Sequence, residues 1–226
     1  MPVEVHSYRL TLRGKPVGTH TLRTQQRGEA ALLEGRTMLQ GNLGQSTVIQ
    51  QSRCHNTGFF SYRFLEETKA RGGNRRYEVV FDSSTGMIRA SRGQNDRAYT
   101  PYLLPYRDPL SMLHEIRRLS RNGGGQTRIP MLGKEIMVLP VGVVTLPTPL
   151  GDREAWAFSL YPGRSFIYVD AEPPHPILRL TQRLTDMSVD ALLVKTHEET
   201  PVPNRERPTK GGGGRKRRRR RSKSRS

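Results

Sequence analysis

Apolar and polar residues alternate over most of the first 200 positions of this chain. Alternation with a period of two is typical of strands that bury one face and expose the other. In the first half, such runs are separated by turns rich in Gly, Asn or Asp, and they cover residues 3–12, 17–24, 31–39, 47–52, 59–67, 77–81 and 87–90. Short strands joined by tight turns predict an antiparallel meander.

One segment has the period of a helix instead. Asp108 precedes Pro109, which is the order of an N-cap and a first-turn proline, and an apolar residue then recurs every three or four positions. We therefore expect one helix near residues 108–121, with Asp108 as its cap and Glu115 as an exposed charge on its surface.

Alternation resumes after three glycines that end this helix. The further expected strands cover residues 126–131, 134–141, 143–146, 155–161, 165–169, 177–184 and 189–195. The pattern predicts a mostly β domain over residues 1–200, built as a curved antiparallel meander sheet or open barrel with one short helix. The helix should pack on the sheet, because a one-sided sheet must cover its apolar face.

The composition changes abruptly after Thr200. Residues 201–214 read as a Pro/Gly linker, and residues 215–226 contain no apolar residue, which predicts a disordered polybasic tail. Residues 201–226 carry 12 Lys and Arg against one acid, a net charge of +11 out of the +18 of the whole chain. The charge is therefore concentrated at one end.

A tail of this kind neutralises phosphates and releases their counterions, so it predicts binding to a nucleic acid, DNA or RNA, with low sequence specificity. A solubilising or targeting appendage is the alternative interpretation of the same charge. The expected contact residues in the tail are Lys210, Arg215, Lys216, Arg217, Arg218, Arg219, Arg220, Arg221, Lys223 and Arg225.

A second basic cluster, Arg71, Arg75 and Arg76, lies at a predicted hairpin tip and joins the candidate nucleic-acid contacts. The nearby aromatic residues at positions 60, 62 and 64 have the spacing of one strand face, as in a platform on which bases stack. Aromatic residues with this spacing more commonly belong to a core, and arginines at a turn are more commonly solvated.

No catalytic residue, metal site or cofactor is predicted, and we do not expect an enzyme. Cys54 is the one cysteine, which excludes an internal disulfide and a CxxC zinc site. Cys54 and His55 are neighbours on a strand, so their side chains should point to opposite faces. The N-terminus has neither a basic nor an apolar signal region. We therefore expect a soluble cytoplasmic protein, with the nucleoid as a candidate location.

Several motifs resemble the bacterial domain-of-unknown-function family 3108 over about residues 5–195. These motifs are residues 8–18 (YRLTLRGKPVG), Phe81-Asp82 with Gly86, Asp108-Pro109-Leu110-Ser111, Thr148-Pro149-Leu150-Gly151, and the strand 166–169 followed by residues 176–180 (PILRL). The resemblance implies a wrapped antiparallel sheet with a helix, similar to exported envelope proteins, and no established reaction. The expected absence of an export signal and the basic tail depart from that family.

The resemblance adds a second hypothesis about function. A curved sheet can enclose an apolar cavity for a lipid or small hydrophobic ligand, and the tail would then contact anionic membrane lipids. The sequence leaves the oligomeric state and the closure of the sheet open.

Overall fold

The computed structural model describes residues 2–93, 96–121, 125–184 and 187–200. The predicted linker and tail, with all ten tail candidates from Lys210 to Arg225, lie outside these residues. The described strands are β1 (Val3–Leu12), β2 (Lys15–Arg27), β3 (Ala30–Leu39), β4 (Ser46–His55), β5 (Ser61–Ala70), β6 (Gly73–Asp82), β7 (Met87–Arg92), β8 (Asp96–Pro101), β9 (Thr127–Met131), β10 (Lys134–Thr148), β11 (Gly151–Tyr161), β12 (Ser165–Asp170), β13 (Ile177–Leu184) and β14 (Met187–Glu199).

All these strands form one antiparallel sheet in the order β8-β7-β6-β5-β4-β3-β2-β1-β14-β13-β12-β11-β10-β9. Strands adjacent in sequence pair as hairpins, except β8 and β9, which are separated by the helix and form the two edges of the sheet. The two ends of the folded region meet where Val3 pairs with Glu199. The predicted fold class, a curved antiparallel meander sheet or open barrel with one short helix, is confirmed, and the sheet is open. The segment after β8 approaches the other edge of the sheet, since the Arg107 amide donates to the Pro130 carbonyl at 2.8 Å.

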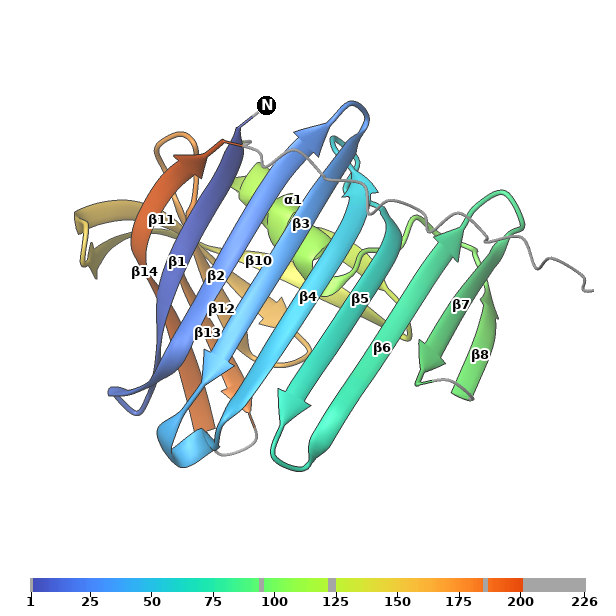
Figure 1. The fold of residues 1–226 in the computed structure, drawn as a ribbon. Helices are drawn as coiled ribbons and strands as arrows, with labels where there is room; N and C mark the ends of the chain where they lie inside the picture. Colours follow the sequence, from blue (N-terminus) through green and yellow to red (C-terminus); the bar gives the residue numbers. More distant parts are fainter. Residues whose placement is uncertain (1, 94–95, 122–124, 185–186, 201–226) are drawn as a thin grey trace, which may run out of the picture.

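The helix α1 (Pro109–Arg121) lies against one face of the curved sheet, called here the inner face (Figure 1). Leu110 packs with Leu33, Phe64 and Val79 of the β3–β6 region, whereas Ile116 packs with residues of β9 to β13 such as Ile167. One helix therefore covers both halves of the sheet. Within the described residues, no helix combines the length and apolarity that crossing a membrane would need.

A close approach between α1 and β3 depends on Gly35. A Cβ atom at this position would lie 3.1 Å from Cδ2 of Leu110 and 3.3 Å from Oε1 of Gln50. These are tighter than ordinary contacts, so the absence of a side chain lets the first turn of the helix reach the sheet.

Three predictions about local structure are wrong. The strands expected at 134–141 and 143–146 form one strand, β10, with an irregularity between Pro140 and Gly142 that shifts its register. The strand β8 was not predicted, because all six of its residues are exposed and give no alternating signal. Glu115 is buried rather than exposed, and its Oε2 accepts from Nε of Arg107 at 2.6 Å.

Candidate functional site

A cavity of about 560 Å³ lies between α1 and the inner face of the sheet. Its lining is largely apolar and comes from both ends of the chain, including Leu10, Leu39, Val48, Leu113, Leu180 and Ala191. Several of these side chains are only partly buried, because the cavity gives water access to them. The inner face therefore keeps apolar surface that the protein itself does not cover.

The strand register explains why these residues meet. His20 on β2 pairs with Thr37 on β3, and Thr37 pairs with Val48 on β4, so the three side chains form one row across the inner face. Leu10 on β1 pairs with Ala191 on β14, which joins the two halves of the chain in the same wall. Curvature of the sheet then brings this wall opposite the helix.

A few polar groups lie within the apolar lining. The Nδ1 atom of His20 is 2.7 Å from Oγ1 of Thr37, and Nε2 of Gln50 donates to Oε2 of Glu66 at 2.8 Å. Desolvation lowers the pKa of His20 to about 4, so its imidazole is neutral at neutral pH. A mostly apolar space with a few placed polar groups is the usual composition of a small-molecule site.

A second space, about 1310 Å³ and here called the basic groove, runs beside the cavity along β5, β6 and β7. Arg75 lies opposite Thr68, and Arg92 lies opposite Tyr77. The guanidinium of Arg92 is 5.6 Å from the centre of the Tyr77 ring, within cation–π range. Leu43 lines both the cavity and the basic groove, so the two spaces adjoin each other at this residue.

The structure divides the arginine cluster predicted from the sequence. Arg71 and Arg75 border the basic groove with exposed side chains. Arg76 lines the groove too, but its guanidinium is paired with Glu67 at 3.3 Å and Glu78 at 3.5 Å. Because residues alternate along β6, Arg76 points to the opposite face from Arg75. Arg92, which the sequence analysis did not select, joins the groove through its register with Tyr77.

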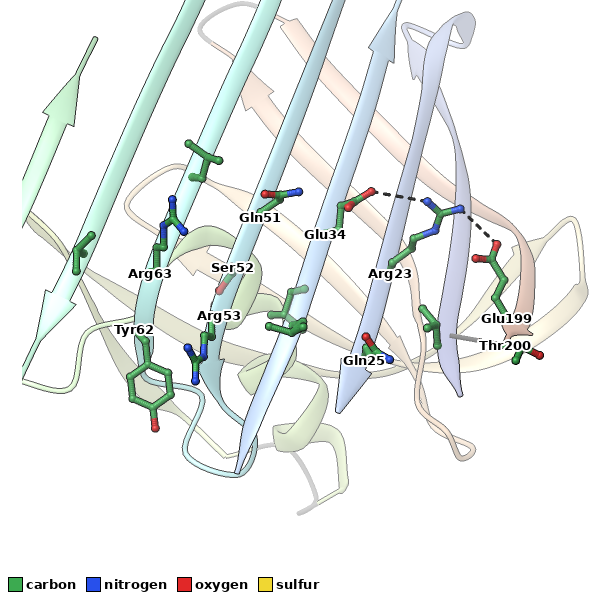
Figure 2. Close-up of a pocket in the computed structure, with 15 residues that line it drawn as sticks. Arg23, Gln25, Glu34, Gln51, Ser52, Arg53, Tyr62, Arg63, Glu199 and Thr200 are labelled. Carbon is green, nitrogen blue, oxygen red and sulfur yellow. Dashed lines mark hydrogen bonds and ion pairs between the residues drawn. The ribbon is translucent and has the colours of Figure 1, made fainter. Parts of the chain in front are cut away.

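The outer face of the sheet, away from α1, has a shallow hollow of about 810 Å³ (Figure 2). Within it, Arg23 bridges Glu34 at 3.7 Å and Glu199 at 3.3 Å. Tyr62 lies on this face beside Arg53, whose Cζ is 5.9 Å from the ring centre. These charges are solvated and paired, so this hollow has a more polar character than the cavity.

The prediction that the aromatic residues at positions 60, 62 and 64 share one strand face is wrong. Phe64 is buried in the core with Leu110, whereas Tyr62 lines the outer hollow and Phe60 precedes the strand. The register shift between Arg53 and Cys54, opposite Tyr62, places Tyr62 and Arg63 on the same face. No stacking platform is built by these three residues.

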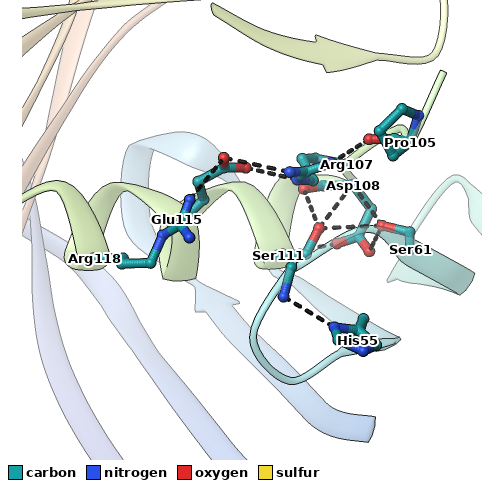
Figure 3. A network of polar contacts seen from close by, with 9 residues as sticks. His55, Ser61, Pro105, Arg107, Asp108, Ser111, Glu115 and Arg118 are labelled. Atoms are coloured by element: carbon teal, nitrogen blue, oxygen red, sulfur yellow. Dashed lines mark hydrogen bonds and ion pairs between the residues drawn. The ribbon is translucent and has the colours of Figure 1, made fainter. Parts of the chain in front are cut away.

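A buried polar network anchors the start of α1 (Figure 3). One carboxylate oxygen of Asp108 accepts from the hydroxyls of Ser52 at 2.5 Å and Ser61 at 2.6 Å. The other accepts from the amides of Leu110 and Ser111 at 2.9 and 3.0 Å, which confirms Asp108 as the helix cap. Desolvation raises the pKa of this carboxyl group. Two of these four donors belong to β4 and β5 and two to the first turn of α1, so the network holds the helix on these strands.

The single thiol belongs to the core rather than to a reactive site. Cys54 is fully buried in the cluster that contains Phe64 and Leu110. Burial raises the pKa of its thiol to about 12, which keeps it protonated and unreactive. In the described part of the chain, no group of three or more His, Cys, Asp or Glu side chains has an arrangement that could hold a metal ion.

Comparison with known proteins supports the fold and leaves the activity open. A family model described as "Protein of unknown function (DUF3108)" matches residues 7–183. No curated protein matches the chain. A crystal structure of a beta-barrel-like protein of domain of unknown function DUF1849 from Brucella abortus is similar, with a TM-score of 0.57 and 13% identity over 88% of this chain and 99% of that chain. At this identity the likeness concerns the fold alone.

Proposed function

Because this chain belongs to DUF3108, a family of proteins of unknown function, its role rests on its own site, and we propose that it is a non-enzymatic carrier of a small hydrophobic molecule. The ligand lies in the cavity between α1 and the inner face. The observation that carries this proposal is the apolar lining of that 560 Å³ space, which water reaches and no part of the described chain fills.

Burial of apolar surface supplies the free energy of binding in this proposal. Each Å² of apolar surface removed from water contributes about 25 cal/mol, and a ligand in this cavity covers its own surface and that of Leu39, Val48 and Leu180 together. Leu43 and Gly163 belong to the lining and lie at hairpin turns. The ligand therefore enters at the end of the sheet where these turns lie.

The polar groups nearby support binding rather than catalysis. His20 is neutral and bonded to Thr37, and the carboxylate of Asp108 is occupied by four donors. Neither residue forms a nucleophile and base pair with the other. The role of His20 and Gln50 in this proposal is to orient a ligand.

The proposal is tested by binding of the uncharged fluorophore Nile red to the full chain. Val48→Phe fills the cavity from the inner face, and it should weaken binding about tenfold. Met38→Phe on the neighbouring strand is the matched control, because Met38 is 48% exposed on the outer face, and its affinity should equal the wild type. Equal affinities for the two variants, or no binding by the wild-type protein, would contradict the carrier proposal.

A second candidate function is nucleic-acid binding by the basic tail. It is supported by the +11 charge of residues 201–226, which lie outside the described residues, and by the exposed Arg71 and Arg75 of the basic groove. The full chain should bind DNA and RNA with low sequence specificity and with an affinity that falls steeply as salt increases. Anionic membrane lipids are the other polyanionic partner to include in the test.

This candidate is measured by fluorescence anisotropy with duplex DNA, single-stranded DNA, RNA and anionic vesicles. The variant replaces the Lys and Arg residues at positions 215–221 with Gln in the full chain. It should lose most of the affinity and most of the salt dependence for polynucleotides. Unchanged polynucleotide affinity would remove the tail from this account, and binding to vesicles alone would assign the tail to membranes.

A further inference from the structure

We infer that the ligand of this carrier is an anionic amphiphile, with its hydrocarbon chain in the cavity and its carboxylate or phosphate head in the basic groove between Arg75 and Arg92. This inference rests on the proposed function and adds the chemical class of the ligand. It follows from the adjacency of an apolar space and a cationic one on the same face of the sheet.

Side chains at the boundary link the linings of the two spaces. Leu43 lines both of them. Gln50 lines the cavity and donates a hydrogen bond to Glu66, which lines the basic groove. A ligand passing Leu43 therefore moves from apolar lining to arginines without leaving the inner face.

The strand register gives the scale of this passage. Val48 pairs with Thr68, and Thr68 pairs with Arg75, so Val48 and Arg75 are two strands apart in one row. Neighbouring strands are about 4.8 Å apart, which places their backbones roughly 10 Å from each other. Because this distance is short, one molecule can contact the cavity wall and the groove at the same time.

The arginines of the groove are available to an anion. Arg75 and Arg92 are exposed, and neither has a carboxylate partner among the described residues. By contrast, carboxylates hold the guanidinium groups of Arg63, Arg76, Arg107, Arg117 and Arg179. A guanidinium group binds a carboxylate or phosphate through two parallel hydrogen bonds. The groove thus presents such donors next to an apolar cavity.

Two neighbouring groups shape the head site. Glu66 brings one negative charge, but its Oε2 is held by Gln50, and Arg71, Arg75 and Arg92 leave the groove positively charged. Desolvation raises the pKa of Tyr77, so its hydroxyl stays protonated and can donate to an anion. An uncharged ester head lacks the attraction between opposite charges and gains only weaker hydrogen bonds.

The experiment measures displacement of Nile red from the full chain by palmitate and by methyl palmitate, which share a chain and differ in charge. The wild type should bind palmitate about tenfold more tightly than the ester. The double variant Arg75→Gln/Arg92→Gln should lose this difference and keep its affinity for the ester. Arg53→Gln is the matched control, because Arg53 is an exposed arginine of the outer face that lies beside a tyrosine ring as Arg92 does, and it should behave as the wild type.

The outcomes separate the two levels of the proposal. If neither compound displaces Nile red, the carrier function itself fails. If both bind equally to the wild type, the anionic class of the ligand is overturned. If Arg53→Gln removes the preference instead, the assignment of the head to Arg75 and Arg92 is overturned. Hexadecyl phosphate should also bind more tightly than inorganic phosphate, and equal affinities for these two would overturn the amphiphile in favour of a simple anion site.

Discussion

The two faces of the sheet differ in how far their polar groups are exposed to water. On the inner face, Asp108 and Arg117 are removed from water, and Arg117 forms a bidentate pair with Glu4 at 3.0 and 2.9 Å. On the outer face, Arg23 and Glu34 form a solvated pair at 3.7 Å. Next to α1, the inner face thus uses its polar groups for structure, and the cavity that it leaves uncovered there is largely apolar. That difference explains why we assign ligand binding to the inner face.

The largest expected effect is a loss of stability on replacing Asp108, compared with Asp82, an exposed aspartate that forms similar local hydrogen bonds. Asp108→Ala removes an acceptor from four donors in a buried site and should destabilise the protein by about 4 kcal/mol. Asp82 caps an exposed turn through the Ser84 and Thr85 amides, so Asp82→Ala should leave Tm close to the wild type. Thermal unfolding of both variants measures this. Equal shifts in Tm would remove the distinction between the faces.

A slightly smaller effect is expected for the arginines. Arg117→Met leaves Glu4 with His6 alone and removes the donor to the carbonyls of Pro174 and His175, which should cost about 3 kcal/mol. Arg23→Met breaks solvated pairs on the outer face and should cost less than about 1 kcal/mol. Urea unfolding gives both values, and an Arg23 variant as unstable as the Arg117 variant would refute the comparison.

The third effect depends on pH. The pKa of His20 falls to about 4 in the folded protein from its usual 6.5, so the neutral form is favoured on folding. Below pH 6.5 the unfolded state binds a proton at His20 and the folded state does not, so the free energy of unfolding falls as the pH falls towards 4. About 2 kcal/mol is lost between pH 7 and pH 5. In His20→Gln, the free energy of unfolding should no longer fall by this amount between pH 7 and pH 5. An unchanged slope in the variant would show that His20 is not desolvated.

The smallest expected effect is the absence of a reaction. A thiol reagent should leave Cys54 unmodified in the folded protein, because the side chain is fully buried and its pKa is about 12. Labelling should appear only with unfolding, and it should be faster in Asp108→Ala, whose helix anchor is weakened. Rapid labelling of the native wild type, followed by mass spectrometry, would place Cys54 at the surface instead.

Much of the fold follows from local pattern. Alternation predicts the strands and their turns, and the Asp108-Pro109 pair predicts the start of the helix. Each of these signals is contained in a few consecutive residues. The strand β8 was not predicted, because an edge strand with six exposed residues has no apolar face and therefore no alternation. β10 was divided in two because Pro140 and Gly142 interrupt its alternation where the strand is irregular.

The candidate site was less accessible from the sequence. The cavity combines residues as distant as Leu10 and Ala191, and only the pairing of β1 with β14 brings them together. The curved-sheet pattern predicted that a cavity could exist, but not which residues line it. Alternation along β6 contained the signal that separates Arg75 from Arg76. Glu115 looked exposed because the partner that buries it, Arg107, precedes the helix.

In the proposed complex, a hydrocarbon chain lies between α1 and the inner face. Nuclear Overhauser contacts between bound palmitate and the methyl groups of the full chain test this position directly, because they report only short distances. We expect contacts from the ligand methylene protons to Val48, Leu180 and Ala191 in the cavity. Contacts to Leu32 and Leu65 of the outer hollow in their place, or no contacts at all, would contradict it.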